Sequence, residues 1–262
     1  MTIYIILQCS KRKSLEPQSD LIWSEKTNIE NWHHAWKNAK VRQVAKKLYS
    51  GRAIKREIEL VESIKGARLF VISAGAGLVD LEERIPSYES TFLPARGPKI
   101  SEWAKLPHGG LTNLSVDVND TIVSFAARNY HKALLEDPEF NALASNFVVA
   151  HTSPIAAADG ASSVIVHPRA AEYLGVAHVD LNSELLKLYL TSGGNGFKKM
   201  HEECDKLPPP AIRTSISDED LMALIQSLES ISSIVETVRY IRHHLGIKAS
   251  YERIRDIIYK LR

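Results

Sequence analysis

The residues best suited to chemistry lie in one short segment, residues 69–92, which reads LFVISAGAGLVDLEERIPSYESTF. An apolar run ends in small residues, from Ser73 through Gly75 to Gly77, where a ligand can closely approach the backbone. Carboxylates follow at once beside the ring of Tyr88, namely Asp80, Glu82, Glu83 and Glu89. This order of residue types indicates a site at the end of a buried strand, and a solvated acidic turn is the alternative for Glu82 and Glu83.

The elements that position this segment alternate between strands and helices. Short apolar runs predict strands at IYIILQC, LFVISA, DTIVSFA, NFVVAHTS and SSVIVHP. Helical periodicity covers about residues 30–65, with a break at Ser50-Gly51, and ELLKLYLTSGG predicts a helix that stops at glycine. Such alternation predicts an α/β fold, with a three-layer, mostly parallel sheet covered on both faces.

Composition excludes several classes of protein. The 262 residues are 44% hydrophobic and carry a formal charge of +2, so the total charge alone does not indicate a polyanionic partner. Cys9 and Cys204 are far apart and lack metal-ligand spacing, so we expect no disulfide and no metal site. The sequence contains no Walker loop or dinucleotide fingerprint, so we expect no cofactor. No apolar run approaches a membrane span and none resembles a secretory leader, so we expect a cytoplasmic protein.

A change in composition predicts two domains. Three prolines interrupt the segment KLPPPAIRTSIS, and prolines cannot continue a helix, so this segment favours an extended linker. We therefore predict an α/β domain over residues 1–205, a linker over 206–216 and a helical domain over 217–262. In the helical domain Ser217 is a good N-cap for a first helix.

The helical domain carries a local excess of positive charge. Ile234, Val238, Ile241 and Leu245 form one apolar stripe, Gly246 permits a turn, and Ser250 can cap a last helix. This arrangement resembles a helix-turn-helix, and the predicted DNA contacts are Arg239, Arg242, Lys248, Tyr251, Arg253 and Arg255. A small helical bundle for dimerisation or internal packing is the alternative.

The segment S-A-G-x-G-L-V, with an acidic turn and then I-P-x-Y-E, resembles a motif of the peroxide-stress YaaA-like proteins and a relative. The matching positions are Ser73, Gly77, Leu78, Glu83, Ile85 and Tyr88. Relatives often carry tyrosine where this chain has Ala76, which we expect to leave extra room in a pocket. Their C-S/T-x-x-K strand end is matched by Cys9, Ser10 and Lys13, and a later G/A-x-x-Y by Ala127 and Tyr130.

The resemblance implies a fold similar to that of uracil-DNA glycosylases, and hence cleavage of an N-glycosidic bond. Such cleavage develops oxocarbenium character, which a carboxylate near the anomeric carbon stabilises while orienting water. Glu83 is the first candidate for this role, Glu89 the second and Asp80 the third. Tyr88 is expected to stack on a flipped base, with Ser73, Gly75 and Gly77 lining the pocket.

Other polar residues at strand ends complete the expected substrate site. Gln8 is placed to read the edge of a base, and Lys11, Arg12 and Lys13 to hold phosphates. Asn129 and Tyr130 follow the DTIVSFA strand, where α/β sheets present ligand groups. The His167-Pro168 pair is similar to a His-Pro pair of uracil-DNA glycosylases, although strand-end histidines are more often capping or packing groups.

These features favour a DNA glycosylase that acts on a modified base in double-stranded DNA, in a role such as defence against phage. One alternative is a DNA-binding stress or regulatory protein without catalysis. Another is a nucleoside hydrolase or base-transferase, which would not need the basic helical tail.

Overall fold

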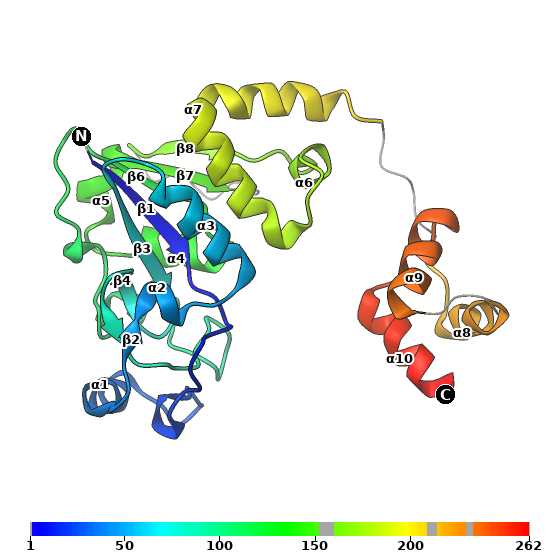
Figure 1. The fold of residues 1–262 in the computed structure, drawn as a ribbon, viewed down its shortest axis with the longest axis horizontal. Helices are drawn as coiled ribbons and strands as arrows, with labels where there is room; N and C mark the ends of the chain where they lie inside the picture. The colour runs from blue at the N-terminus through cyan, green and yellow to red at the C-terminus, as the bar shows by residue number, and fades with distance from the viewer. Residues whose placement is uncertain (1, 152–159, 209–213, 229–232, 262) are drawn as a thin grey trace. The chain divides into compact units, whose positions relative to one another are not determined.

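The computed structural model describes residues 2–151, 160–208, 214–228 and 233–261 (Figure 1). The chain forms two compact units, Met1–Lys206 and Leu207–Arg262. Each unit has a hydrophobic core of its own. The division falls one residue beyond the predicted end of the α/β domain, and residues 209–213 of the predicted linker lie outside the described residues.

A six-stranded sheet lies at the centre of the first unit, counted over the described residues, in the order β4-β3-β1-β6-β7-β8. Its strands are β1 (Ile3–Gln8), β3 (Ala67–Ser73), β4 (Gly77–Asp80), β6 (Thr121–Ser124), β7 (Phe147–His151) and β8 (Ser162–Ile165). Neighbouring strands are parallel except for β3 and β4. The fold is therefore α/β with a mostly parallel sheet, as predicted.

The central strands read as continuous apolar runs because helices cover both faces of the sheet. Residues 4–7 of β1 and 70–73 of β3 are all buried. The helices are α1 (Ile29–Asn38), α2 (Ala45–Leu48), α3 (Arg52–Glu62), α4 (Arg128–Leu135), α5 (Phe140–Leu143), α6 (Ala170–Tyr173) and α7 (Leu181–Asp205).

Helix α3 packs on β1 and β3, whereas α7 packs on α3 and β8 (Figure 1). The connections β1–α3–β3 and β6–α4–β7 lead from the centre of the sheet in opposite directions. Because such crossovers are right-handed, they place α3 and α4 on opposite faces. The carboxyl end of β1 therefore lies where the strand order reverses, the usual place for a ligand.

Two helix predictions differ from the structure. The helix expected to run to Ser50 ends at Asn38, and β2 (Gln43–Val44) pairs antiparallel with β5 (Arg84–Ile85). This pairing joins segments far apart in sequence, which local periodicity cannot reveal. The predicted glycine stop is a kink at Gly193, with φ +56°, after which α7 continues to Asp205.

The second unit is helical in its described residues. It contains α8 (Asp218–Ser227), α9 (Ile234–Arg239), a π-helical turn (Tyr240–His244) and α10 (Tyr251–Leu261). Ser217 caps α8 as predicted, since its Oγ accepts from the amide of Asp220 at 3.0 Å. Gly246, with φ +63°, makes the turn before α10, whose first turn is capped by Ser250.

Among the described helices, none combines the length and the apolar character needed to cross a membrane.

Candidate functional site

A crevice of about 340 Å³ lies at the carboxyl end of β1. We call it the β1 crevice; it is lined by residues 8–12 and 51–54, and by Glu57, Asp180 and Asn182. Gly51 permits its narrow base, because a Cβ there would lie 2.7 Å from the Cβ of Ser10. The Ser10 hydroxyl also accepts from the Gly51 amide at 3.3 Å, which fixes the loop after β1 against the start of α3.

Glu57 brings a carboxyl group into the β1 crevice from the apolar face of α3. Glu57 shares that face with Ile54, Ile58 and Val61, and only 7% of the Glu57 residue is exposed. Its Oε1 accepts from the hydroxyl of Ser183 at 2.8 Å. Burial raises the pKa of Glu57, and it outweighs the opposing effects of Ser183 and Arg56. This carboxyl group therefore keeps its proton to a higher pH than an exposed glutamate.

Asp180 supplies a second carboxyl group in a different environment. It is 8% exposed, and its Oδ2 accepts from the Arg52 guanidinium at 2.6 Å. Its Oδ1 lies 3.7 Å from Arg56 and accepts no hydrogen bond from the residues that the structure describes. One carboxyl group whose pKa is raised by burial thus shares a crevice with one that forms an ion pair, an arrangement suited to acid and base roles.

The outer part of the β1 crevice is basic. Lys11 and Arg12 are exposed, and the side chain of Arg52 is 70% exposed even though it pairs with Asp180. The amino-terminal end of α3 adds the positive end of the helix dipole, and the first N–H groups of a helix have no partner within the helix. Gln8 accepts from the amide of Ala127 at 2.8 Å, which joins the ends of β1 and β6. This rim suits a phosphate.

Four of the predicted substrate-binding residues line the β1 crevice: Gln8, Cys9, Ser10 and Lys11. Tyr130 lies directly behind it, with its hydroxyl 3.4 Å from the Sγ of Cys9 and its ring 5.1 Å from that of Phe92. Burial raises the pKa of Tyr130, so its hydroxyl stays protonated. Asn129 is exposed on α4 and does not line the β1 crevice.

Tyr88 is fully buried and Lys13 is partly buried beside it. Tyr88 is 1% exposed, and its hydroxyl bonds to Tyr49 at 2.7 Å and to Ser73. Burial raises its pKa far above the usual value. The Nζ of Lys13 lies 4.2 Å from the centre of the Tyr88 ring, and burial lowers the Lys13 pKa although Glu89 opposes this. Stacking of Tyr88 on a flipped base would require this packing to open.

The glycines of the 73–77 loop make room for the chain itself rather than for a ligand. A Cβ on Gly75 would lie 2.6 Å from the Tyr88 ring, and one on Gly77 would overlap the carbonyl oxygen of Gly109. Ala76 is fully buried, so it does not enlarge a pocket. Ser73 is also fully buried, and its Oγ accepts from the amides of Gly75 and Ala76 at 3.2 Å. The expectation of close ligand approach here is corrected accordingly.

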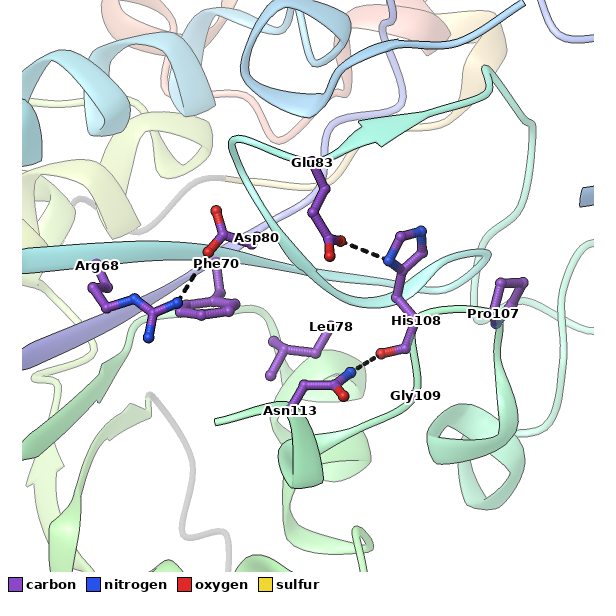
Figure 2. A pocket seen from close by; sticks show the side chains of 9 residues that line it. All are labelled: Arg68, Phe70, Leu78, Asp80, Glu83, Pro107, His108, Gly109 and Asn113. Atoms are coloured by element: carbon purple, nitrogen blue, oxygen red, sulfur yellow. Dashed lines mark hydrogen bonds and ion pairs between the residues drawn. The ribbon is translucent and has the colours of Figure 1, made fainter. Parts of the chain in front are cut away.

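The predicted catalytic carboxylates are divided between two places. Asp80 and Glu83 line a separate cavity of about 450 Å³, which we call the β4 pocket (Figure 2). There Asp80 pairs with Arg68 at 3.3 Å, and Glu83 pairs with His108 at 2.7 Å. Glu89 is exposed elsewhere, where its backbone pairs with the segment at Leu21 and Trp23. The β4 pocket shares no lining residue with the β1 crevice.

His167 has a local structural role. Its Nε2 lies 3.2 Å from a carboxylate oxygen of Asp205, and its Nδ1 accepts from the amide of Arg169 at 3.1 Å. Its ring meets that of His201 edge to face at 5.2 Å. It therefore ties the segment after β8 to the end of α7, and it lines neither the β1 crevice nor the β4 pocket.

In the second unit some of the predicted DNA contacts brace the fold. Arg242 donates to the carbonyl oxygen of Ala249 at 2.7 Å. Arg253 donates to Asp218 at 2.6 Å and to the carbonyl oxygen of Ile216 at 2.8 Å. Arg255 pairs with its neighbour Asp256. The remaining predicted contacts are exposed, and these are Arg239, Lys248 and Tyr251.

Sequence reasoning missed Glu57, Asp180 and His108. Glu57 had a usable signal, because it is a carboxylate within the apolar stripe of an amphipathic helix. Asp180 had no such signal in the sequence, since only the tertiary fold brings it into contact with Arg52 and Arg56 of α3. In the part of the chain that the structure describes, no group of three or more histidine, cysteine or acidic side chains is arranged to hold a metal ion.

Residues 35–149 match the model of a family of unknown function, DUF6884. The matched segment includes Glu57 and the whole β4 pocket, and it excludes residues 8–12 and Asp180. No curated protein and no solved structure matches the chain. The match covers less than half of the chain, and it assigns no activity to these residues.

Proposed function

We propose that the protein is a DNA glycosylase that cleaves the N-glycosidic bond of a base, and that the β1 crevice is its active site. The observation that carries this proposal is the pair of carboxyl groups in unlike environments, Glu57 and Asp180. We also propose that the fold is similar to that of uracil-DNA glycosylases, as the sequence motif led us to expect.

The two carboxyl groups suit the two halves of the reaction. Water adds to the anomeric carbon while the bond from that carbon to the base nitrogen breaks. Asp180 orients the water and takes up the proton that the water loses, and it stabilises positive charge on the sugar. Glu57, whose pKa is raised by burial, donates its proton to the departing base.

The charges around the β1 crevice favour a substrate with phosphates. Lys11 and Arg12 are exposed beside the amino-terminal end of α3, where backbone N–H groups can donate to a phosphate oxygen. Gln8 and Asn182 offer amide groups to the edge of a base. These groups fit a nucleotide within a strand better than an uncharged sugar.

The second unit supports a polymeric substrate. Its exposed cations include Arg239, Lys248 and Lys260, and the exposed ring of Tyr251 begins α10. Helix α9, the turn at Gly246 and the capped α10 resemble a helix-turn-helix, in which the last helix contacts DNA. We propose that this unit holds double-stranded DNA through its phosphates.

The test is the release of base from a panel of duplex DNAs that contain unmodified, uracil-containing or glucosylated bases, measured by liquid chromatography. Glu57→Gln and Asp180→Asn should each reduce release by roughly 100-fold or more, because each removes an acid–base or charge-stabilising group. Glu59→Gln is the matched control, since Glu59 is exposed on the same helix. The proposal fails if no DNA loses a base, or if both variants match the control.

A nucleoside hydrolase is the second candidate, because every residue that lines the β1 crevice belongs to the first unit. Free nucleosides and nucleotides in the same assay separate the two functions. Release from free nucleosides that equals release from DNA at every salt concentration would favour this candidate over the glycosylase.

A further inference from the structure

The β4 pocket is lined mainly by polar groups. Phe70 on β3 and Leu78 on β4 lie beneath these groups and are almost fully buried, and Pro107 closes one side (Figure 2). The rim carries hydrogen-bonding groups of both kinds, with acceptors on Asp80 and Glu83 and donors on Arg68 and Asn113. Its volume of about 450 Å³ falls within the range of small-molecule sites.

The wall opposite Glu83 is fixed before any ligand arrives. The amide of His108 donates to the carbonyl oxygen of Ala76 at 2.8 Å, and the amide of Leu78 donates to Gly109 at 2.9 Å. Gly77 sits against Gly109 with no room for a Cβ, and the Asn113 amide bonds to the carbonyl oxygen of His108. Side chains on such a clamped segment need little reorganisation to bind.

Glu83 is oriented by His108 yet remains accessible. Burial lowers the pKa of His108, and it outweighs the effect of Glu83, so the ring is neutral at pH 7. Its Nδ1 lies 2.7 Å from the Oε2 of Glu83, and as a neutral N–H it donates to that oxygen. The Glu83 side chain is 50% exposed, and a carboxylate can accept further bonds on both oxygens.

We propose that the β4 pocket binds a guanine-type heterocycle, as a free base or nucleoside, with Glu83 accepting from its two adjacent N–H donors. A carboxylate matches two parallel N–H groups in a bidentate pair. Further N–H groups of Arg68 and Asn113 can donate to the ring carbonyl. A heterocycle that presents carbonyl oxygens toward Glu83 is repelled.

This inference does not rest on the proposed glycosylase activity, because the two pockets share no lining residue. It also differs from the role first expected for Glu83. In the β4 pocket Glu83 recognises a ligand, and no bond is made or broken.

The test is calorimetric titration of the full chain with guanosine, and with inosine, which differs only by lacking the 2-amino group. We expect guanosine to bind at least tenfold more tightly than inosine, because inosine leaves half of the bidentate pair unmade. Glu83→Gln should abolish this discrimination. Glu82→Gln is the matched control, since Glu82 is exposed beside Glu83 and should retain it.

Three results would overturn the proposal: no heat of binding for guanosine up to millimolar concentration, equal affinity for both nucleosides, or discrimination that survives Glu83→Gln. Asp180→Asn separates the two pockets, since it should reduce base release and leave guanosine binding unchanged. Loss of guanosine binding in Asp180→Asn would indicate that guanosine binds in the β1 crevice and not in the β4 pocket. Circular dichroism of each variant establishes that the fold is intact.

Discussion

Replacing Tyr88 by phenylalanine removes one hydroxyl group from the core of the first unit. That hydroxyl bonds to Tyr49 at 2.7 Å and to Ser73, and all three residues are at most 1% exposed. Each lost bond costs about 1 kcal/mol, and Ser73 keeps its bonds from the amides of Gly75 and Ala76. Tyr88→Phe should therefore lower the free energy of unfolding by about 2 kcal/mol, which corresponds to roughly 4–8 °C in Tm for a unit of this size.

The assay is urea denaturation followed by tryptophan fluorescence. The Trp36 ring lies 5.3 Å from that of Tyr88 and the Trp32 ring lies 6.4 Å from it, so the signal reports this region. Tyr173→Phe, at an exposed tyrosine on α6, is the control and should change stability little. At temperatures where the variant is folded, base release should be retained. Unchanged stability together with lost base release would refute the placement of Tyr88 in the core and favour contact with substrate.

Gly77→Ala should destabilise the first unit by about 3 kcal/mol or more, because φ is +93° and a Cβ would overlap Gly109; thermal unfolding measures this, and a wild-type Tm would refute it. The imidazole of His108 should titrate with a midpoint below about pH 6.5 when it is followed by NMR, and Glu83→Gln should lower that midpoint further. Because the pKa of His108 is depressed in the folded state, the stability contributed by neutral His108 is lost as the pH falls below about 6.5. In the second unit, Arg253→Ala should lower the helix content on heating, because it removes the bond to Asp218. Lys248→Ala should leave the fold intact and reduce the slope of log K for DNA binding against log salt concentration by about 1. Equal slopes for Lys248→Ala and the wild type would exclude a phosphate contact of Lys248.

The parallel strands were predictable because each reads as one short apolar run, and in β1 and β6 all residues but those at the strand ends are buried. Strand β4 was not predicted, since GLVD is too short to show a period. Its antiparallel course has a direct consequence for the acidic segment. Asp80 lies opposite Phe70, in the middle of β3, whereas Glu89 lies beside the segment at Ile22. Carboxylates that are neighbours in sequence are thus separated in the fold.

The β1 crevice was predicted in part. Residues 8–11 could be placed because the carboxyl end of a central parallel strand is where ligands bind. Glu57 could have been noticed, since burying an acid on the apolar face of a helix has a cost that function often explains. Asp180 depends on the packing of α7 against α3, and no local pattern encodes that contact.

The separate cores of the two units affect how this protein must be measured. All four tryptophans, Trp23, Trp32, Trp36 and Trp103, lie in the first unit, whereas far-ultraviolet circular dichroism also records the helices of the second. Fluorescence and circular dichroism can therefore yield different midpoints without any folding intermediate within either unit. A fluorescence midpoint reports on the unit that contains the β1 crevice and the β4 pocket, and it does not register loss of the unit proposed to hold DNA. Variants such as Arg253→Ala accordingly require circular dichroism or calorimetry.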